Sequence, residues 1–201
     1  MQLRSWDFAF LSDLQSPQNG VRQYDIAGKK LTLVIRGKVG VALNPKLASA
    51  WRAGGSKLVV RGGHKRGNTR VMGLVFPRQG RVWGLSLICV YAPVSGPKYQ
   101  KAREQLYAEL STAEQKCSIS DPVCIIGANF KAALGKPLDQ DERDVLGDHG
   151  DEGRSASGVD MMSWCLAGPY VAADTVFTQP GPKSTWWHPR WGTAHHINHV
   201  L

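Results

Sequence analysis

The stretch that says most about this protein is Val123-Cys124-Ile125-Ile126-Gly127-Ala128-Asn129-Phe130-Lys131-Ala132-Ala133-Leu134-Gly135. Its first half is a short apolar run, typical of a buried strand, and it passes into a turn bounded by glycine. The end of such a strand is a usual position for an Asp that binds Mg²⁺. Here the polar residue is the amide Asn129, and the cation Lys131 follows two residues later. The stretch therefore has the outline of a metal-binding loop without its carboxylate.

Short apolar or alternating runs punctuated by Gly and Pro recur on both sides of this stretch and predict strands. They lie at residues 8–11, 30–35, 40–43, 57–60, 70–76, 82–91, 122–126, 171–177 and 196–201. Residues 98–114 and 158–167 instead have apolar side chains at helical spacing. Many strands with few helices predict an α/β sandwich with a mixed or antiparallel sheet. We expect a single globular domain over residues 1–201.

Composition limits the class of protein. The chain has 42% apolar and 20% charged residues, which is typical of a globular protein. It has no run of 18 apolar residues and no signal-peptide core near its start, so we expect no membrane insertion and a soluble protein. The cysteines are widely spaced, and two lie in apolar runs. Buried free thiols fit a reducing compartment, which is the nucleus, the cytoplasm or an organelle matrix.

The net charge of +9 is unevenly distributed. Residues 1–100 carry 16 Lys and Arg against 3 Asp and Glu, whereas residues 101–201 carry 9 against 13. A basic half of this kind can bind nucleic-acid phosphates without reading sequence. It can equally dock on RNA or on an acidic protein in an assembly, and charge alone does not separate these partners.

Two polar segments are candidate binding loops. Residues 62–68, which include Lys65 and Arg66, are predicted to form a hairpin loop, with phosphate binding as the alternative. Residues 137–154 form a second predicted loop with seven acidic side chains. We interpret that loop as solvated surface rather than a metal site.

Five segments in order resemble a known family. They are residues 36–43, 90–96, 125–135, 154–165 and 184–201, and together they span nearly the whole chain. The chain resembles the endonuclease/exonuclease/phosphatase superfamily, specifically the endonuclease domain that non-LTR (LINE-type) retrotransposons carry ahead of their reverse transcriptase. The resemblance implies a four-layer α/β sandwich, with two packed β-sheets flanked by helices. It also implies phosphodiester cleavage with Mg²⁺, for which carboxylates hold the cation and polar donors stabilise the phosphoryl oxygens.

This chain departs from the family pattern at the positions that carry the chemistry. Ser12 or Asp13 stands where the family has a Glu metal ligand, and Asn129 and Lys131 replace the Asp and Asn of its Gly-Asp-Phe-Asn motif. Ser155 replaces an Asn that precedes a helix, and Asn198 replaces the Asp beside the catalytic His. A neutral amide does not take a proton from water at neutral pH.

Other matching positions support the site rather than perform the chemistry. Tyr91, Arg190 and His199 match the pattern, but without its neighbouring Asp we expect His199 to lack an orienting carboxylate and to be mostly uncharged. The pattern also begins with an Asn-bearing strand that has no counterpart ahead of Trp6. Either the chain is a fragment of a longer protein, or the edge of the sandwich is trimmed and open to a partner.

The segment near the end of the chain suggests two further sites. If residues 195–199 are a strand, His195 and His199 share one face and His196 points to the other, so no metal site is expected there. Trp187 and Arg190, with Lys65, Arg66 and Arg70, are candidate nucleic-acid contacts. Packing beneath the loop is the alternative for the tryptophans, and the favoured one for Trp186.

Three functions remain open from the sequence. The first, which the joint loss of carboxylates favours, is a catalytically inactive endonuclease-like domain that serves as a structural or docking subunit of a protein or ribonucleoprotein assembly. The second is a nucleic-acid-binding domain that does not cleave. The third is a Mg²⁺-dependent endonuclease that uses Asp13, Asn129 and Asn198 in an unusual way. We expect no cofactor and no metal for the first two, and Mg²⁺ only for the third.

Overall fold

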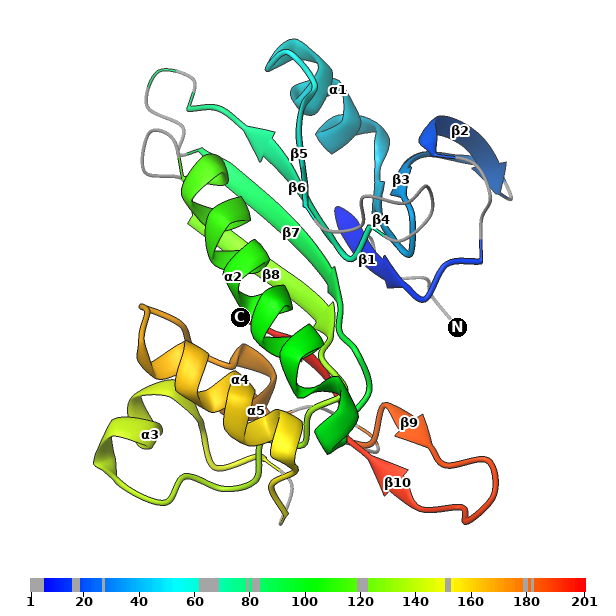
Figure 1. Cartoon of the computed structure of the whole chain (residues 1–201). Coiled ribbons are helices and arrows are strands. Elements are labelled where there is room, and N and C mark those ends of the chain that lie inside the picture. The colour runs from blue at the N-terminus through cyan, green and yellow to red at the C-terminus, as the bar shows by residue number, and fades with distance from the viewer. Residues whose placement is uncertain are drawn as a thin grey trace. The chain divides into compact units, whose positions relative to one another are not determined.

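A computed structural model describes residues 6–15, 19–26, 28–61, 69–78, 80, 84–118, 123–150, 153–178, 181 and 183–201. The chain divides into two compact units. Unit 1 comprises Met1–Tyr91 and Ala108–Ile126, and unit 2 comprises Ala92–Tyr107 and Gly127–Leu201. The predicted fold class is confirmed, because the protein is a mixed α/β fold with two main sheets and several helices (Figure 1).

The first sheet belongs to unit 1 and is antiparallel. It contains β1 (Phe8–Ser12), β2 (Gly20–Ile26), β3 (Lys29–Arg36) and β4 (Val39–Leu43) in the order β1-β4-β3-β2. Strand β4 is buried along its whole length, as expected for an apolar strand that pairs on both sides. Strand β1 lies at an edge of the sheet.

The second sheet has the order β11-β8-β7-β6-β5. Unit 1 contributes β5 (Lys57–Arg61), β6 (Val71–Phe76) and β7 (Leu85–Tyr91), and β8 (Val123–Asn129) runs from unit 1 into unit 2, where its end pairs with β11 (Asn198–Val200). Strands β6 and β7 are almost wholly buried. Their near-continuous apolar sequences are typical of strands that are covered on both faces.

The core of unit 1 lies between the two sheets. Val41 and Leu43 of β4 and Met72 and Leu87 of β6 and β7 are fully buried in one cluster. Burying each of these side chains stabilises the fold by about 1.5–3 kcal/mol. Helix α1 (Pro45–Ala53) closes the cluster with Trp51.

Helix α1 was not predicted from the sequence, although its start carries two ordinary signals. The Asn44 side chain accepts a hydrogen bond from the Leu47 backbone N–H at 2.8 Å, and Pro45 occupies the first turn. The predicted helix at 98–114 is confirmed as a 3₁₀ turn, η1 (Pro97–Tyr99), followed by α2 (Gln100–Cys117). At the α2 end, a Cβ on Gly73 of β6 would lie 2.6 Å from Cys117 Sγ, so only glycine allows this approach.

Unit 2 contains the remaining helices and a two-stranded hairpin. They are α3 (Gln140–Val145), α4 (Ala156–Leu166), α5 (Ala173–Val176), β9 (Trp186–Trp187) and β10 (Ala194–His195). The first turns of α2 pack on α4, where Arg103 pairs with Asp160 at 2.5 Å and the Tyr107 and Trp164 rings lie 5.8 Å apart. The predicted helix at 158–167 is thus confirmed, two residues longer at its start.

Two predicted elements were wrong, and one strand was confirmed only in part. The predicted strand at 171–177 is the single helical turn α5, which Thr175 secures by donating to the Ala172 carbonyl at 2.7 Å. The predicted strand at 196–201 is regular only over Asn198–Val200, and the predicted loop at 137–154 contains α3. No described helix is both long enough and apolar enough to span a membrane.

The cysteines are free. Cys89, Cys117 and Cys165 are buried, and Cys124 is half-buried. Burial raises the pKa of the Cys89 thiol to about 12, so it is a poor nucleophile. This agrees with the prediction of buried free thiols.

Candidate functional site

The end of β8 and the short strand β11 bring together two of the changed positions. The apolar run that forms β8 ends at Asn129, and in the antiparallel register Asn198 lies directly opposite it. His199 lies opposite Ala128 in the same pair. The structure therefore places two amides side by side where the family pattern has two carboxylates.

The turn after β8 is fixed by burial and by one backbone hydrogen bond. Phe130 is fully buried, and the Lys131 N–H donates to the Ile197 carbonyl at 3.2 Å. Lys131 has a φ of 52°, a left-handed conformation that non-glycine residues seldom adopt. The burial of Phe130 and the hydrogen bond from Lys131 to Ile197 thus hold this loop in place.

Asn129 is half-buried, and its side-chain oxygen is buried without a hydrogen bond. Its side-chain Oδ1 is inaccessible to solvent and has no hydrogen-bond partner among the described residues. Native structures contain few such atoms, because an unpaired buried polar group costs about 1–3 kcal/mol. No described contact gives this side chain a structural role through its oxygen.

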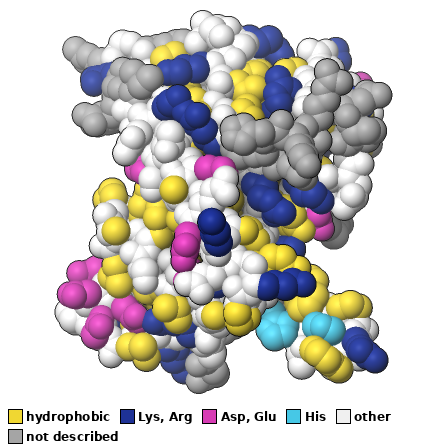
Figure 2. All heavy atoms as spheres, viewed as in Figure 1, with side chains coloured by type: hydrophobic (Ala, Val, Ile, Leu, Met, Phe, Trp, Pro, Cys, Tyr) yellow, Lys and Arg dark blue, Asp and Glu magenta, His cyan; other side chains and the backbone are white. Residues whose placement is uncertain are grey.

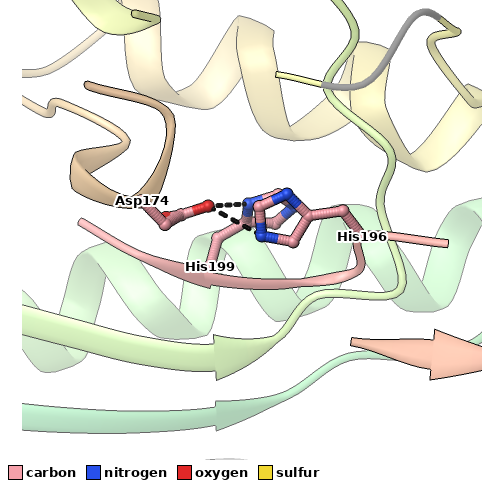
Figure 3. A group of neighbouring side chains, drawn as sticks. All are labelled: Asp174, His196 and His199. Carbon is pink, nitrogen blue, oxygen red and sulfur yellow. Dashed lines mark hydrogen bonds and ion pairs between the residues drawn. The ribbon is translucent and has the colours of Figure 1, made fainter. Parts of the chain in front are cut away.

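His199 has a carboxylate partner, contrary to the prediction from the sequence. Its Nδ1 lies 2.8 Å from Asp174 Oδ2, and Asp174 comes from α5 rather than from the residue before the histidine (Figure 3). The expectation of an unsupported His199 was therefore wrong. One signal was present in the sequence: Asp174 is a lone acid in the apolar run 171–177, and a charge in such a run needs a partner.

The other nitrogen of His199 is also occupied. Nε2 lies 2.8 Å from the Ala132 carbonyl oxygen, and the side chain is 1% exposed. A carbonyl only accepts hydrogen bonds, so Nε2 carries a proton and its N–H donates a hydrogen bond to the Ala132 carbonyl oxygen. This nitrogen is therefore turned into the protein rather than available to a phosphate.

The Asp174 carboxylate also contacts His196. Its Oδ2 lies 3.1 Å from His196 Nε2, and its Oδ1 accepts the Val200 N–H at 2.8 Å. Burial alone raises the pKa of the Asp174 carboxyl, but the hydrogen bonds from His196 and His199 more than offset this effect, and the pKa lies well below its usual range. The carboxyl is therefore ionised at neutral pH.

The predicted placement of the three histidines was wrong. His196 and His199 converge on one carboxylate because the chain turns at residues 196–197, between β10 and β11, instead of continuing as one strand. His195 lies elsewhere, with its Nε2 3.0 Å from Thr193 Oγ1.

In unit 1, Asp13 and Tyr91 lie among cations. Asp13 Oδ1 is 3.6 Å from Lys38 Nζ, and Arg70 and Lys38 lie 5.4 Å and 5.7 Å from the centre of the Tyr91 ring. Desolvation, followed by a hydrogen bond with Asp13, raises the pKa of Tyr91 to about 12. The phenol remains protonated, and the carboxylate is matched by positive charge.

Ser155 keeps a structural role at the start of α4. Its Oγ accepts the Gly158 N–H at 3.1 Å and the Ala133 N–H at 3.0 Å. Ser and Asn are comparable helix N-caps, so the change from the family's Asn preserves this role. A Cβ on Gly158 would lie 1.9 Å from the Ala133 carbonyl oxygen, which requires glycine there.

The adjacent Arg154 is held by a buried acid. Its guanidinium pairs with both Glu142 oxygens, at 2.5 and 2.7 Å, and Nε donates to the Leu134 carbonyl at 2.6 Å. The hydrogen bond from Arg154 holds the pKa of the Glu142 carboxyl below its usual range. One acid of the segment expected to be solvated surface is thus a structural ion pair, while its neighbours Asp139, Asp141 and Asp144 are exposed.

The hairpin β9–β10 exposes its aromatic rings. Trp187 and Trp191 are 54% and 70% exposed, and Trp186 is 38% exposed, so the favoured packing of Trp186 beneath the loop was wrong. The His188 ring stacks on Trp191 with centroids 4.2 Å apart, and Arg190 lies in the turn between the strands. Residues 62–68, with Lys65 and Arg66, lie outside the described residues.

The charge asymmetry of the sequence is visible on the surface. Figure 2 shows Lys and Arg spread over unit 1, whereas acidic side chains gather near α3 in unit 2. The imidazole rings of the hairpin region lie beside hydrophobic side chains in the same view.

No family model matches the chain, and no curated protein matches it. Solved structures do match it. One of them is the endonuclease domain of TRAS1, a telomere-specific non-LTR retrotransposon. The sequence identity is 14% and the TM-score is 0.46, and the match covers 96% of this chain and 71% of that chain.

The residues present do not fit the Mg²⁺ that the sequence resemblance implies. Mg²⁺ is held in proteins by carboxylate oxygens and water in near-octahedral geometry. At the family-equivalent positions, unit 2 offers the amides Asn129 and Asn198 and the cation Lys131. Unit 1 offers only Asp13, which already pairs with Lys38.

Proposed function

We propose that this chain is a catalytically inactive, endonuclease-like domain that serves as a structural or docking subunit of a protein or ribonucleoprotein assembly. The observation that carries the proposal is the engagement of His199, whose Nε2 donates to the Ala132 carbonyl inside the protein. A histidine that stabilises a phosphoryl oxygen needs a ring nitrogen directed at that oxygen. The amides Asn129 and Asn198 support the proposal further, because a neutral amide does not supply the negative charge of a metal-binding carboxylate.

Two surface features support a docking role. Strand β1 pairs with β4 on one side and has no other strand partner among the described residues, so its outer edge can accept a strand. Strand β2 exposes Val21 and Ile26, at 51% and 60%. The basic half of the chain offers electrostatic attraction to RNA or to an acidic protein.

Sedimentation of the native protein tests this role. We expect the tagged chain, expressed at its natural level, to sediment with a large assembly in a density gradient. When Val21 and Ile26 are both changed to Lys, a smaller fraction of the chain should sediment with the assembly. A matched change of the exposed residues Val171 and Val176 in unit 2 serves as the control. Sedimentation of the wild-type chain only as a free monomer would contradict the docking role.

A second function is favoured by the charges around Asp13. In unit 1, Lys38 and Arg70 lie near the Tyr91 ring, and in unit 2 the hairpin exposes Trp187; each surface by itself suits a nucleic acid bound without cleavage. This alternative predicts DNA or RNA affinity that falls steeply with salt, with the slope reporting the phosphates neutralised. Absence of a mobility shift with micromolar nucleic acid at low salt would remove it.

A further inference from the structure

Three side chains of unit 2 converge on a single oxygen atom. Asp174 Oδ2 lies 2.8 Å from His199 Nδ1 and 3.1 Å from His196 Nε2, and the three atoms all lie within 4.8 Å of one another. The side chains come from α5, from the turn before β11 and from β11 itself (Figure 3). All three are at most 6% exposed.

The Ala132 carbonyl determines what can lie between His199 and Asp174. It accepts the Nε2–H of His199, so in a neutral ring the lone pair is on Nδ1. That nitrogen faces Asp174 Oδ2 at 2.8 Å, so either it carries a second proton that it donates to the carboxylate, or its lone pair binds a metal ion that the carboxylate also binds. Two acceptors at this distance require a cation between them, either a proton or a metal ion.

His196 completes a metal-binding donor set. Its Nε2 approaches the same carboxylate oxygen, while Val200 fixes the other oxygen of Asp174 through its N–H. A metal-binding histidine ordinarily donates its second ring N–H to a backbone carbonyl or a carboxylate, as His199 does to Ala132. Two imidazole nitrogens and one carboxylate are a donor set that suits Zn²⁺.

We propose that Asp174, His196 and His199 form a zinc site. Asp174 Oδ2, His196 Nε2 and His199 Nδ1 are the protein ligands, and a water molecule is the fourth. Zn²⁺ with bonds of about 2.0–2.1 Å places tetrahedral ligand atoms about 3.3 Å apart, so the side chains must adjust when the metal binds. The site is distinct from the Mg²⁺ positions of the endonuclease pattern and does not depend on the proposed docking function.

The burial of the ligands gives this zinc a structural role. A metal at this point links α5 to β11 and to the turn that precedes it, through residues far apart in the sequence. Structural zinc is bound as the ligands assemble, and its binding free energy becomes folding free energy. We therefore expect zinc to raise the thermal unfolding temperature of the chain.

Metal analysis of matched variants tests the site. The full chain is stripped with a chelator, incubated with Zn²⁺, separated by gel filtration and analysed for bound zinc by mass spectrometry. We expect about one zinc ion per wild-type chain and the same for His195→Gln. His196→Gln and Asp174→Asn, each checked for folding by circular dichroism, should bind zinc at least about 100-fold more weakly.

A spectroscopic measurement on the wild-type chain keeps the test independent of variant folding. Long-range ¹⁵N NMR of the histidine rings should show zinc-induced shifts at His199 Nδ1 and His196 Nε2, with the proton of His199 on Nε2. Substitution of Co²⁺ should give visible absorption without a thiolate charge-transfer band. Wild-type protein that retains no zinc, equal zinc loss in His195→Gln and His196→Gln, or a thiolate band from the cysteines would each overturn the proposal.

Discussion

The start of α4 and the end of β8 both depart from the endonuclease pattern, but their surroundings differ. At α4, Ser155 replaces an Asn and still caps the helix through its Oγ. At β8, Asn129 replaces an Asp and leaves a buried oxygen without a described partner. Ser155 therefore keeps a physical role in the fold, whereas the side-chain oxygen of Asn129 has no described contact that would give it one.

Among substitutions that test this comparison, we expect the largest loss of unfolding free energy at Glu142. Glu142→Ala leaves the guanidinium of Arg154 half-buried without its bidentate partner, and we expect a loss of about 3 kcal/mol in the free energy of unfolding. Urea denaturation measures this loss. Asp144→Ala, an exposed acid in the same helix, is the control and should change stability by less than about 0.5 kcal/mol. Equal losses in the two variants would mean that the ion pair does not support α4.

The same ion pair predicts a pH dependence. The pKa of Glu142 is lowered in the folded chain, so its contribution is complete above the unfolded value of 4.5 and is lost as pH falls through the folded pKa. Between about pH 5 and pH 3, wild-type protein should therefore lose more stability than Glu142→Gln. Parallel stability curves for the two proteins would contradict the assignment.

The next effect concerns the close approach of α4 to the loop after β8. Gly158→Ala places a Cβ against the Ala133 carbonyl oxygen, and we expect a loss of about 2 kcal/mol in unfolding free energy. Gly153→Ala is the matched control, since a Cβ there meets no atom within 4 Å. Thermal denaturation that finds both variants as stable as wild type would show that the approach is looser than described.

A smaller effect tests the helix cap. Ser155→Ala removes the acceptor for the Gly158 and Ala133 N–H groups and should lower the unfolding free energy by about 1 kcal/mol. Ser155→Asn restores the residue of the family pattern and should be close to wild type, because Asn caps as well as Ser. If Asn is as damaging as Ala in urea denaturation, Ser155 does more than cap the helix.

The smallest effect is expected at the end of β8. Asn129→Ala removes an oxygen that makes no described hydrogen bond, so we expect a change below about 0.5 kcal/mol in unfolding free energy. Ser155→Ala, measured in the same denaturation series, should lose more unfolding free energy than Asn129→Ala. A loss larger than that of Ser155→Ala would reveal a structural role for Asn129 and would contradict the contrast drawn between the start of α4 and the end of β8.

The sequence predicted the elements whose patterns are strong. Apolar runs located β6, β7 and β8, and helical spacing located α2 and α4. Strand β2 escaped because Arg22, Gln23 and Asp25 interrupt its apolar pattern. The run at 171–177 favours a strand by composition, but tertiary packing makes it the turn α5.

The candidate site was predictable in part. The amides Asn129 and Asn198 were identified from the motif, and their cross-strand pairing follows from the fold. Asp174 was recognisable as a lone acid in an apolar run, but its pairing with His199 was not predictable, because the two residues lie 25 positions apart and the run favours a strand rather than the helical turn α5. Orientation of the His199 ring depends on the Ala132 carbonyl, which no sequence pattern reports.

The most direct test of the central claim is a nicking assay on supercoiled plasmid DNA with purified full-length chain in Mg²⁺ or Mn²⁺. The loss of the metal-binding carboxylates and the engagement of His199 predict that wild type and Asn129→Ala both leave the plasmid supercoiled, as in the presence of a chelator. Metal-dependent nicking by wild type that Asn129→Ala abolishes would contradict the account.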